Sequence, residues 1–225
     1  MHFKPISKLK HNIMIELVAN MNEILINHNL LLDEEGVLNE YEQVEEAWNK
    51  RANQLPNPLN QDKPLIKYLI IGEATVSYAN YFYNPHSPET AFLRARHFNC
   101  ITKPELINLF QANSVLVFDL YPLPLPTFIY DNVKFDCTDP DYVRLLNEYY
   151  EAKLGGRIDK NTKVVLRYIK LWKRCEWKIF VDFFSRHGAT VTTVIENENE
   201  RPLNISGNIG ADENKIRNIF DAIIP

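Results

Sequence analysis

The sequence predicts an α/β protein, a three-layer α/β/α sandwich with a mostly parallel central sheet and additional helices at the N-terminus. Two near-continuous apolar runs, Ile66–Ile71 and Ser114–Phe118, have the length and composition of strands buried on both faces. Segments with helical spacing alternate with such runs along the chain. This alternation is typical of a parallel sheet covered by helices on both sides.

Two helices are predicted before the first strand. Apolar residues recur at helical spacing over Lys8–Leu31, and Val37–Asn53 repeats the pattern more weakly. The segment Leu55–Asn60 contains two prolines and is expected to be extended, because proline disfavours helical geometry in the residue before it. At 225 residues we expect a single domain, with residues 1–60 as an N-terminal helical extension.

The elements that follow continue the alternation. Between the two apolar strands, Glu89–Phe98 and Pro104–Ala112 have helical patterns, and Thr102 is the expected N-cap of the second. A helix is also expected over Asp141–Lys153, whereas the rest of the stretch from Thr127 to Asp159 has no clear pattern. The last part of the chain is expected to form a strand, a long helix, a second strand and a final helix, at Lys163–Tyr168, Lys170–His187, Ala189–Ile195 and Glu213–Ile223.

Composition excludes several kinds of site. The 7 glycines form neither G-x-G-x-x-G nor G-x-x-x-x-G-K, which excludes the glycine-dependent dinucleotide and Walker-type sites. The 3 cysteines are scattered and the 6 histidines lack ligand spacing, so we expect no metal, no cofactor and no disulfide framework, and a reducing cytoplasm as the location. No apolar stretch approaches the roughly 18 residues that span a bilayer. We therefore expect a soluble monomer with no membrane partner.

Charge is unevenly distributed, although the net charge is only -4. Residues 33–46 hold seven carboxylates and no basic side chain, whereas residues 163–178 hold six basic side chains and one acid. The basic segment predicts a local face that can bind phosphates. A solvated helix face is the alternative, and charge alone favours it.

Three strand-end loops carry the candidate functional residues, because ligands of open parallel sheets bind outside the carboxyl ends of the strands. The first loop, Gly72–Pro85, places Glu73 directly at a strand end and contains the aromatic run Tyr81–Tyr83. The second, Asp119–Pro126, begins with a carboxylate at the end of a buried strand, where a charge is costly unless it is paired or used. The third, Arg201–Gly210, leads into the last helix and is suited to hold a phosphate with backbone amides.

Each loop also has a purely structural interpretation. A glycine and an acid at a strand end often form only a tight turn with a helix-capping carboxylate. An aromatic run such as Tyr81–Tyr83 is more often a lid over the core than a stacking platform. Ser206–Asn208 is most simply a loop with a helix cap. The convergence of the three loops at one edge of the sheet favours the functional interpretation.

With these residues identified, the sequence resembles the uracil-DNA glycosylase superfamily over Leu65–Pro126 and Lys163–Phe220. Members of that family have a three-layer α/β/α fold, flip a base out of DNA and hydrolyse its N-glycosidic bond without a metal or a diffusible cofactor. The resemblance therefore implies a monofunctional DNA glycosylase whose partner is single-stranded DNA or duplex DNA with a flipped base. The motifs that carry it are Leu69–Ala74, Asn80–Tyr83, Phe118–Pro122 and Pro202–Asn208.

The resemblance implies roles for the residues around the first two motifs. Glu73 is the expected catalytic carboxylate of the water-activating motif and Ala74 lies beside the base, although Thr75 replaces the usual proline. Phe82 or Tyr83 is expected to stack on the flipped base.

Further roles fall on the later motifs. Asp119 stands where a base-reading asparagine usually ends its strand. The histidine that stabilises the departing base has no counterpart between Asn199 and Asn204, and one of these two asparagines is expected to replace it. The expected DNA contacts are Lys170, Lys173, Arg174, Arg201, Ser206, Gly207 and Asn208.

The chemistry of N-glycosidic cleavage fits these residue types. Positive charge develops on the sugar and negative charge on the base, so a site needs a carboxylate near the first and donors near the second. Glu73 can supply the carboxylate, and Asn204, Ser206 or backbone amides can supply the donors. No lysine within the motifs is placed to act as an amine nucleophile, which favours simple hydrolysis.

An ionised Asp119 only accepts hydrogen bonds, which favours an amino-bearing base over uracil. We therefore expect a modified base, in foreign DNA such as that of a phage, and a role in defence. The alternatives are a catalytically inactive nucleic-acid-binding member of the same fold, a conventional uracil-removing repair enzyme, and an enzyme acting on free nucleosides or nucleotides.

Overall fold

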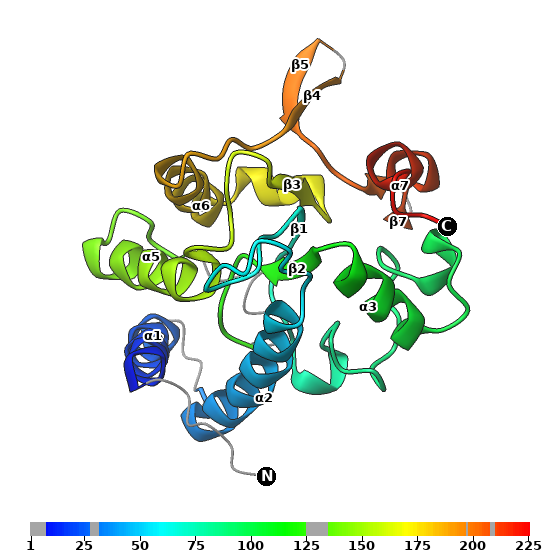
Figure 1. Ribbon diagram of the computed structural model, residues 1–225. Coiled ribbons are helices and arrows are strands. Elements are labelled where there is room, and N and C mark those ends of the chain that lie inside the picture. Colours follow the sequence, from blue (N-terminus) through cyan, green and yellow to red (C-terminus); the bar gives the residue numbers. More distant parts are fainter. Residues whose placement is uncertain (1–7, 28–31, 125–134, 197, 208–209) are drawn as a thin grey trace.

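The chain folds around a short parallel sheet, as the computed structural model in Figure 1 shows. The structure describes residues 8–27, 32–124, 135–196, 198–207 and 210–225. Strands β1 (Tyr68–Gly72), β2 (Val115–Asp119) and β3 (Lys163–Leu166) lie in the order β2-β1-β3, all parallel. The predicted α/β class and the three central strands are confirmed.

Helices lie on both sides of this sheet. In Figure 1, α5 and α6 lie on one side, α3 and α7 lie on the other, and α1 and α2 lie beside them. Thr102 caps α3 as predicted, in a capping box with Glu105. Within the described ranges, no helix is long and apolar enough to span a bilayer. The helix bounds are Lys8–Asn27 (α1), Glu34–Asn53 (α2), Lys103–Ala112 (α3), Pro140–Leu154 (α5), Cys175–Arg186 (α6) and Glu213–Phe220 (α7).

The N-terminal helices belong to the core. One cluster of buried apolar side chains runs from Ile13 in α1 to Ile223 after α7 and includes all of β1 except its terminal glycine. Trp48 of α2 is fully buried and donates its indole N–H to the carbonyl of Val117 in β2, at 3.0 Å. The described parts of α1 and α2 therefore contribute side chains to the same core as the sheet.

The predicted helix Glu89–Phe98 is wrong. Thr90 and Leu93 form an isolated antiparallel bridge, and only Ala95–Phe98 turns, as a short 3₁₀ helix. The Glu89 carboxylate accepts from the backbone N–H of Ala95 at 2.7 Å. Such side-chain to backbone bonds compete with helical hydrogen bonding, and they hold this segment as a compact turn.

The predicted long helix Lys170–His187 is broken in two. Residues Ile169–Lys173 form a 3₁₀ helix, Arg174 is extended (ψ 144°), and α6 begins only at Cys175. The residues just after the break are anchored elsewhere, because Cys175 is disulfide-bonded and Glu176 is 3% exposed. Tertiary contacts therefore fix the start of α6.

The predicted strand Ala189–Ile195 does not join the sheet. Residues Thr193–Glu196 (β4) pair antiparallel with Asn199–Pro202 (β5), in a hairpin that projects from the body of the protein (Figure 1). The chain returns to the sheet at Leu203–Ile205. The backbone N–H of Leu166 donates to the carbonyl of Leu203 at 2.7 Å, and the N–H of Ile205 donates to the carbonyl of Leu166 at 3.0 Å. A second, very short hairpin of β6 (Ser206–Gly207) and β7 (Gly210–Ala211) follows before α7.

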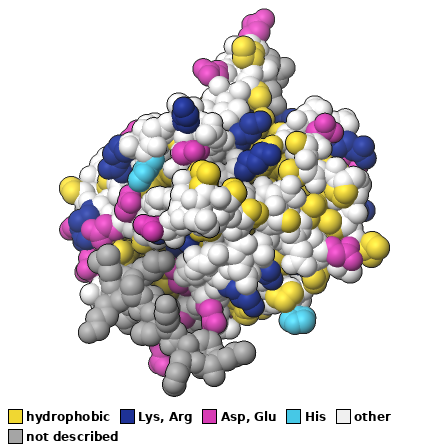
Figure 2. Space-filling view, viewed as in Figure 1, with side chains coloured by type: hydrophobic (Ala, Val, Ile, Leu, Met, Phe, Trp, Pro, Cys, Tyr) yellow, Lys and Arg dark blue, Asp and Glu magenta, His cyan; other side chains and the backbone are white. Residues whose placement is uncertain are grey.

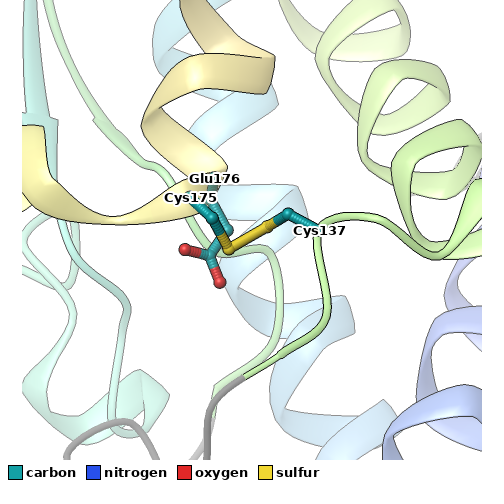
Figure 3. Close-up of side chains that lie close together, drawn as sticks. All are labelled: Cys137, Cys175 and Glu176. Carbon is teal, nitrogen blue, oxygen red and sulfur yellow. A yellow bond between two sulfur atoms is a disulfide. The ribbon is translucent and has the colours of Figure 1, made fainter.

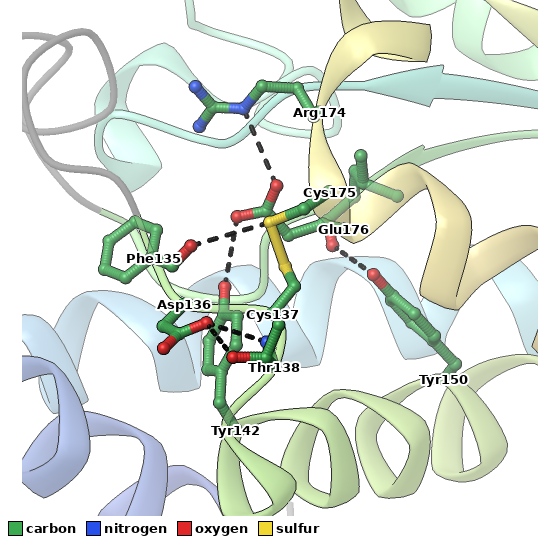
Figure 4. The surroundings of a disulfide bond; sticks show 10 residues. Phe135, Asp136, Cys137, Thr138, Tyr142, Tyr150, Arg174, Cys175 and Glu176 are labelled. Atoms are coloured by element: carbon green, nitrogen blue, oxygen red, sulfur yellow. Dashed lines mark hydrogen bonds and ion pairs between the residues drawn. A yellow bond between two sulfur atoms is a disulfide. The ribbon is translucent and has the colours of Figure 1, made fainter.

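The structure contains a disulfide that the sequence analysis did not predict, between Cys137 and Cys175, which are 38 positions apart in the sequence and have a Cα–Cα distance of 5.8 Å. Beside it lies the buried carboxylate of Glu176 (Figure 3). Figure 4 shows this carboxylate accepting from the Tyr142 hydroxyl at 3.2 Å and facing Arg174 Nε at 3.7 Å. The bridge joins two of the 3 cysteines, for which the sequence analysis expected no disulfide framework.

Candidate functional site

The carboxyl ends of the three strands place charged residues in one row. The register pairs Gly72 of β1 with Asp119 of β2. On the other side of β1, the backbone N–H of Arg167 donates to the carbonyl of Ile71 at 2.9 Å. Asp119, Gly72 and Arg167 therefore follow one another across the sheet, and Glu73 continues from Gly72 at the same edge.

Glu73 lies at this edge beside a lysine. Its side chain is 17% exposed, and Lys170 Nζ lies 3.2 Å from its Oε2 atom. The same Nζ lies 5.6 Å from the centroid of the Tyr168 ring. Because the Lys170 side chain is 58% exposed, this ion pair contributes little to stability.

Asp119 is tied to the first loop. Its Oδ2 atom accepts from the Thr75 hydroxyl at 2.6 Å. Burial raises the pKa of the Asp119 carboxyl, while the Thr75 hydrogen bond and the Arg167 charge act in the opposite direction. Burial therefore favours the neutral carboxyl, whereas Thr75 and Arg167 both favour the ionised form.

A small cavity lies beside Asp119 on the side of α2. Its volume of about 10 Å³ is roughly the room that one water molecule needs. The lining includes Tyr81, Glu45 and Trp48, so α2 closes the space that a base would need on this side. Of the aromatic run Tyr81–Tyr83, Tyr81 lines this cavity, whereas Phe82 and Tyr83 do not.

Phe82 and Tyr83, the predicted stacking residues, are core residues, and this prediction is corrected. They are 5% and 3% exposed. Phe82 packs on Phe110 of α3, and the Tyr83 hydroxyl accepts from the backbone N–H of Val117 at 2.7 Å. Both rings are occupied by packing, so the alternative interpretation as a lid over the core describes them.

Another aromatic pair lies at the carboxyl edge. Phe92 and Tyr168 are partly exposed, and their ring centroids are 4.3 Å apart in an edge-to-face arrangement. The sequence carried one signal for this pair, since Tyr168 ends the apolar run of the third strand. Phe92 was hidden in a segment expected to be a helix.

The two asparagines proposed to replace a histidine are separated. Asn204 is 2% exposed, and its side chain bonds the carbonyl of Pro202, the hydroxyl of Ser206 and Lys215 Nζ at 3.2 to 3.3 Å. It therefore holds the last loop against β3, and its amide is occupied inside the protein. Asn199 is exposed and pairs with Glu196 near the tip of the projecting hairpin. The structure does not bring Asn199 to the strand ends.

The predicted DNA-contacting residues have different surroundings. Lys170 and Lys173 are exposed, whereas Arg174 is partly buried and faces Glu176. Ser206 accepts from the backbone N–H of Ile169 at 3.1 Å.

The other residues predicted to contact DNA do not join Lys170 and Lys173 in one basic surface. Arg201 is partly buried in β5, Ala74 is partly buried after Glu73, Gly207 is exposed in β6, and Asn208 lies outside the described residues. On the face shown in Figure 2, basic and acidic side chains interleave and do not form one basic patch.

Comparison with protein-family models, with curated proteins and with solved structures found no match to this chain. The resemblance to uracil-DNA glycosylases thus depends on the motifs in the sequence.

Proposed function

We propose that this protein is a monofunctional DNA glycosylase in which Glu73 is the catalytic carboxylate, on a sandwich of the three-layer type. The observation that carries the proposal is the position of Glu73. It lies at the carboxyl end of the central strand, remains partly exposed, and is linked through Lys170 to the partly exposed Tyr168–Phe92 pair. A carboxylate, an aromatic surface and cations at one sheet edge are what hydrolysis of a flipped nucleotide requires.

In the proposed reaction, Glu73 orients a water molecule and stabilises positive charge on the sugar as the bond to the base breaks. Tyr168 and Phe92 replace the stacking that the base loses when it leaves the duplex. Lys170 and Lys173 contact the phosphates on either side of the flipped nucleotide. Lys170 exchanges Glu73 for a phosphate when DNA binds, which frees the carboxylate.

The proposed substrate is a modified, amino-bearing base, and the proposed setting is defence against foreign DNA. Support comes from Asp119, because an ionised carboxylate accepts from an exocyclic amine. Since the cavity beside Asp119 holds only about one water, base binding requires the residues around it to move. If Asp119 reads the base, Asp119→Asn shifts the preference towards uracil.

The test is base release from oligonucleotides that carry uracil, cytosine and modified cytosines, in single strands and duplexes, followed by alkali to cleave abasic sites. We expect release from at least one modified base, and a loss of at least about 100-fold in Glu73→Gln, because that change removes a charge at the reacting centre and keeps the shape. Glu148→Gln, on the exposed face of α5, is the matched control and should retain full activity. Full activity in Glu73→Gln would contradict the assignment.

A second candidate is a nucleic-acid-binding protein without catalysis. Two observations favour it: Lys170 forms an ion pair with the Glu73 carboxylate, and the space beside Asp119 is too small for a base. This protein would bind the same oligonucleotides and release nothing from any of them. Binding without base release on this panel would therefore identify the second function, and base release would exclude it.

A further inference from the structure

The row of residues across the strand ends contains a buried cation that the proposed catalysis does not use. Arg167 follows β3 and is only 8% exposed. Its Nη2 atom donates to the hydroxyls of Thr90 and Tyr168 over long distances of 3.3 and 3.4 Å. The buried Nε has no hydrogen-bond partner, and no carboxylate of the described residues forms an ion pair with this guanidinium. Asp119 is close enough to feel the Arg167 charge, but the buried Nε of the guanidinium has no hydrogen-bond partner. An unpartnered polar atom of a buried cation is costly, so its retention at this edge points to a ligand.

Gly72 creates the space in which Arg167 meets Asp119. A Cβ atom on Gly72 would lie 2.2 Å from Asp119 Oδ1 and 3.2 Å from Arg167 Nη1. The two atoms therefore face the same point above the bare Cα of Gly72. Any side chain at position 72 would collide with the carboxylate there.

Two threonines form hydrogen bonds with Asp119 Oδ2 and Arg167 Nη2, the atoms of the pair that do not face Gly72. Thr75 donates to Asp119 Oδ2, and Thr90 accepts from Arg167 Nη2. Among the described residues, no side chain or backbone group bonds Asp119 Oδ1 or Arg167 Nη1. An acceptor and a donor thus stand side by side over Gly72.

We propose that Asp119 and Arg167 together bind the edge of the flipped base, and that Arg167 stabilises the negative charge the base acquires as it departs. Such an edge presents an N–H beside an acceptor atom, as cytosine, adenine and uracil all do. For the proposed amino-bearing base, Asp119 accepts from the exocyclic amine and Arg167 supplies the donor that a carboxylate lacks. The adjacent Asp119 carboxylate disfavours a phosphate at this point, because two anions would face each other. This proposal rests on the proposed function and names the group that takes the charge on the leaving base.

Binding is tested apart from cleavage. The probes are oligonucleotides with an uncleavable 2′-fluoroarabino nucleotide of cytosine, 5-hydroxymethylcytosine, adenine or uracil, and a tetrahydrofuran abasic analogue. In the unmodified protein, at least one base should bind about 10- to 100-fold more tightly than the abasic analogue. Arg167→Met should remove this advantage and leave abasic affinity unchanged, whereas Arg167→Lys, which keeps the charge without the planar fork, should keep part of it.

The control is Arg157→Met, which removes a buried guanidinium near the amino ends of the strands, where Arg157 bonds the carbonyl of Ala52. It should leave the ratio of base to abasic affinity unchanged. Three outcomes would overturn the inference: no base advantage in the unmodified protein, an advantage that persists in Arg167→Met, or an equal loss for the abasic analogue, which would make Arg167 a phosphate contact.

Base release distinguishes this inference from the proposed function. On a substrate that the unmodified protein cleaves, Arg167→Met should lower the single-turnover rate by about 100- to 1,000-fold, the usual effect of removing a donor to developing charge. If the unmodified protein shows the Arg167-dependent base preference but cleaves nothing, the proposed function fails and the binding site stands. If Arg167→Met cleaves at the unmodified rate, the function stands and the inference fails.

Discussion

The buried ion pair between Glu45 of α2 and Lys153 of α5 connects the N-terminal helices to the rest of the core. The two side chains are 0% and 4% exposed. Glu45 also accepts from the Tyr41 hydroxyl at 3.0 Å and from Asn49 Nδ2 at 2.7 Å, and Lys153 Nζ lies 4.2 Å from the centroid of the Trp48 ring. Replacing Lys153 with methionine keeps much of the packing volume and leaves the Glu45 carboxylate without this cation.

We expect Lys153→Met to lower the free energy of unfolding by about 3 to 5 kcal/mol, the usual cost of removing one partner of a buried pair. Replacing both partners removes the uncompensated charge, so Glu45→Gln combined with Lys153→Met should be more stable than Lys153→Met alone. Urea unfolding at pH 7, followed by the fluorescence of the 3 tryptophans, measures both variants. The reasoning is refuted if Lys153→Met costs less than about 1 kcal/mol, or if the two substitutions simply add.

Three further predictions follow from particular contacts. Cys175→Ser should destabilise the oxidised protein by about 3 to 4 kcal/mol, because the bridge closes 38 positions, and no loss under oxidising conditions would show that the bridge does not form. Replacing Lys170, Lys173 and Arg174 by alanine should weaken DNA binding and flatten its salt dependence, and an unchanged salt slope would identify a solvated surface. Burial lowers the pKa of Lys103 to about 8, so the unfolded chain binds more protons between pH 8 and 10.5. The unmodified protein should therefore gain stability relative to Lys103→Met as the pH rises through this window. Urea unfolding of both proteins at pH 7 to 10 measures this difference in stability, and a difference that stays constant or falls would contradict the prediction.

Apolar pattern determined the sheet and several helices. The runs at Ile66–Ile71 and Ser114–Phe118 became β1 and β2 because strands buried on both faces must be apolar throughout. Thr102 capped α3 because a capping box involves only nearby residues. The arrival of Glu73 and Asp119 at one edge followed from parallel pairing, which brings all carboxyl ends together.

Long-range contacts decided the rest. Phe82 and Tyr83 have the composition of a stacking platform, and only their packing on α3 and β2 shows that they are core. The break before α6 depends on Cys175, whose partner is 38 positions away, so no local pattern indicates it.

Sequence alone determined the three parallel strands and the acids at the ends of β1 and β2, because periodicity and local caps are properties of neighbouring residues. The tertiary structure decided what those acids meet. Arg167 is one of several basic residues in its segment, and the register beside β1 alone places it over Gly72 against Asp119. The size of the space beside Asp119 likewise depends on Trp48 and Glu45 of α2, which are far from Asp119 in the chain. Register and helix packing join residues that are distant in sequence, and such contacts leave no periodic signal.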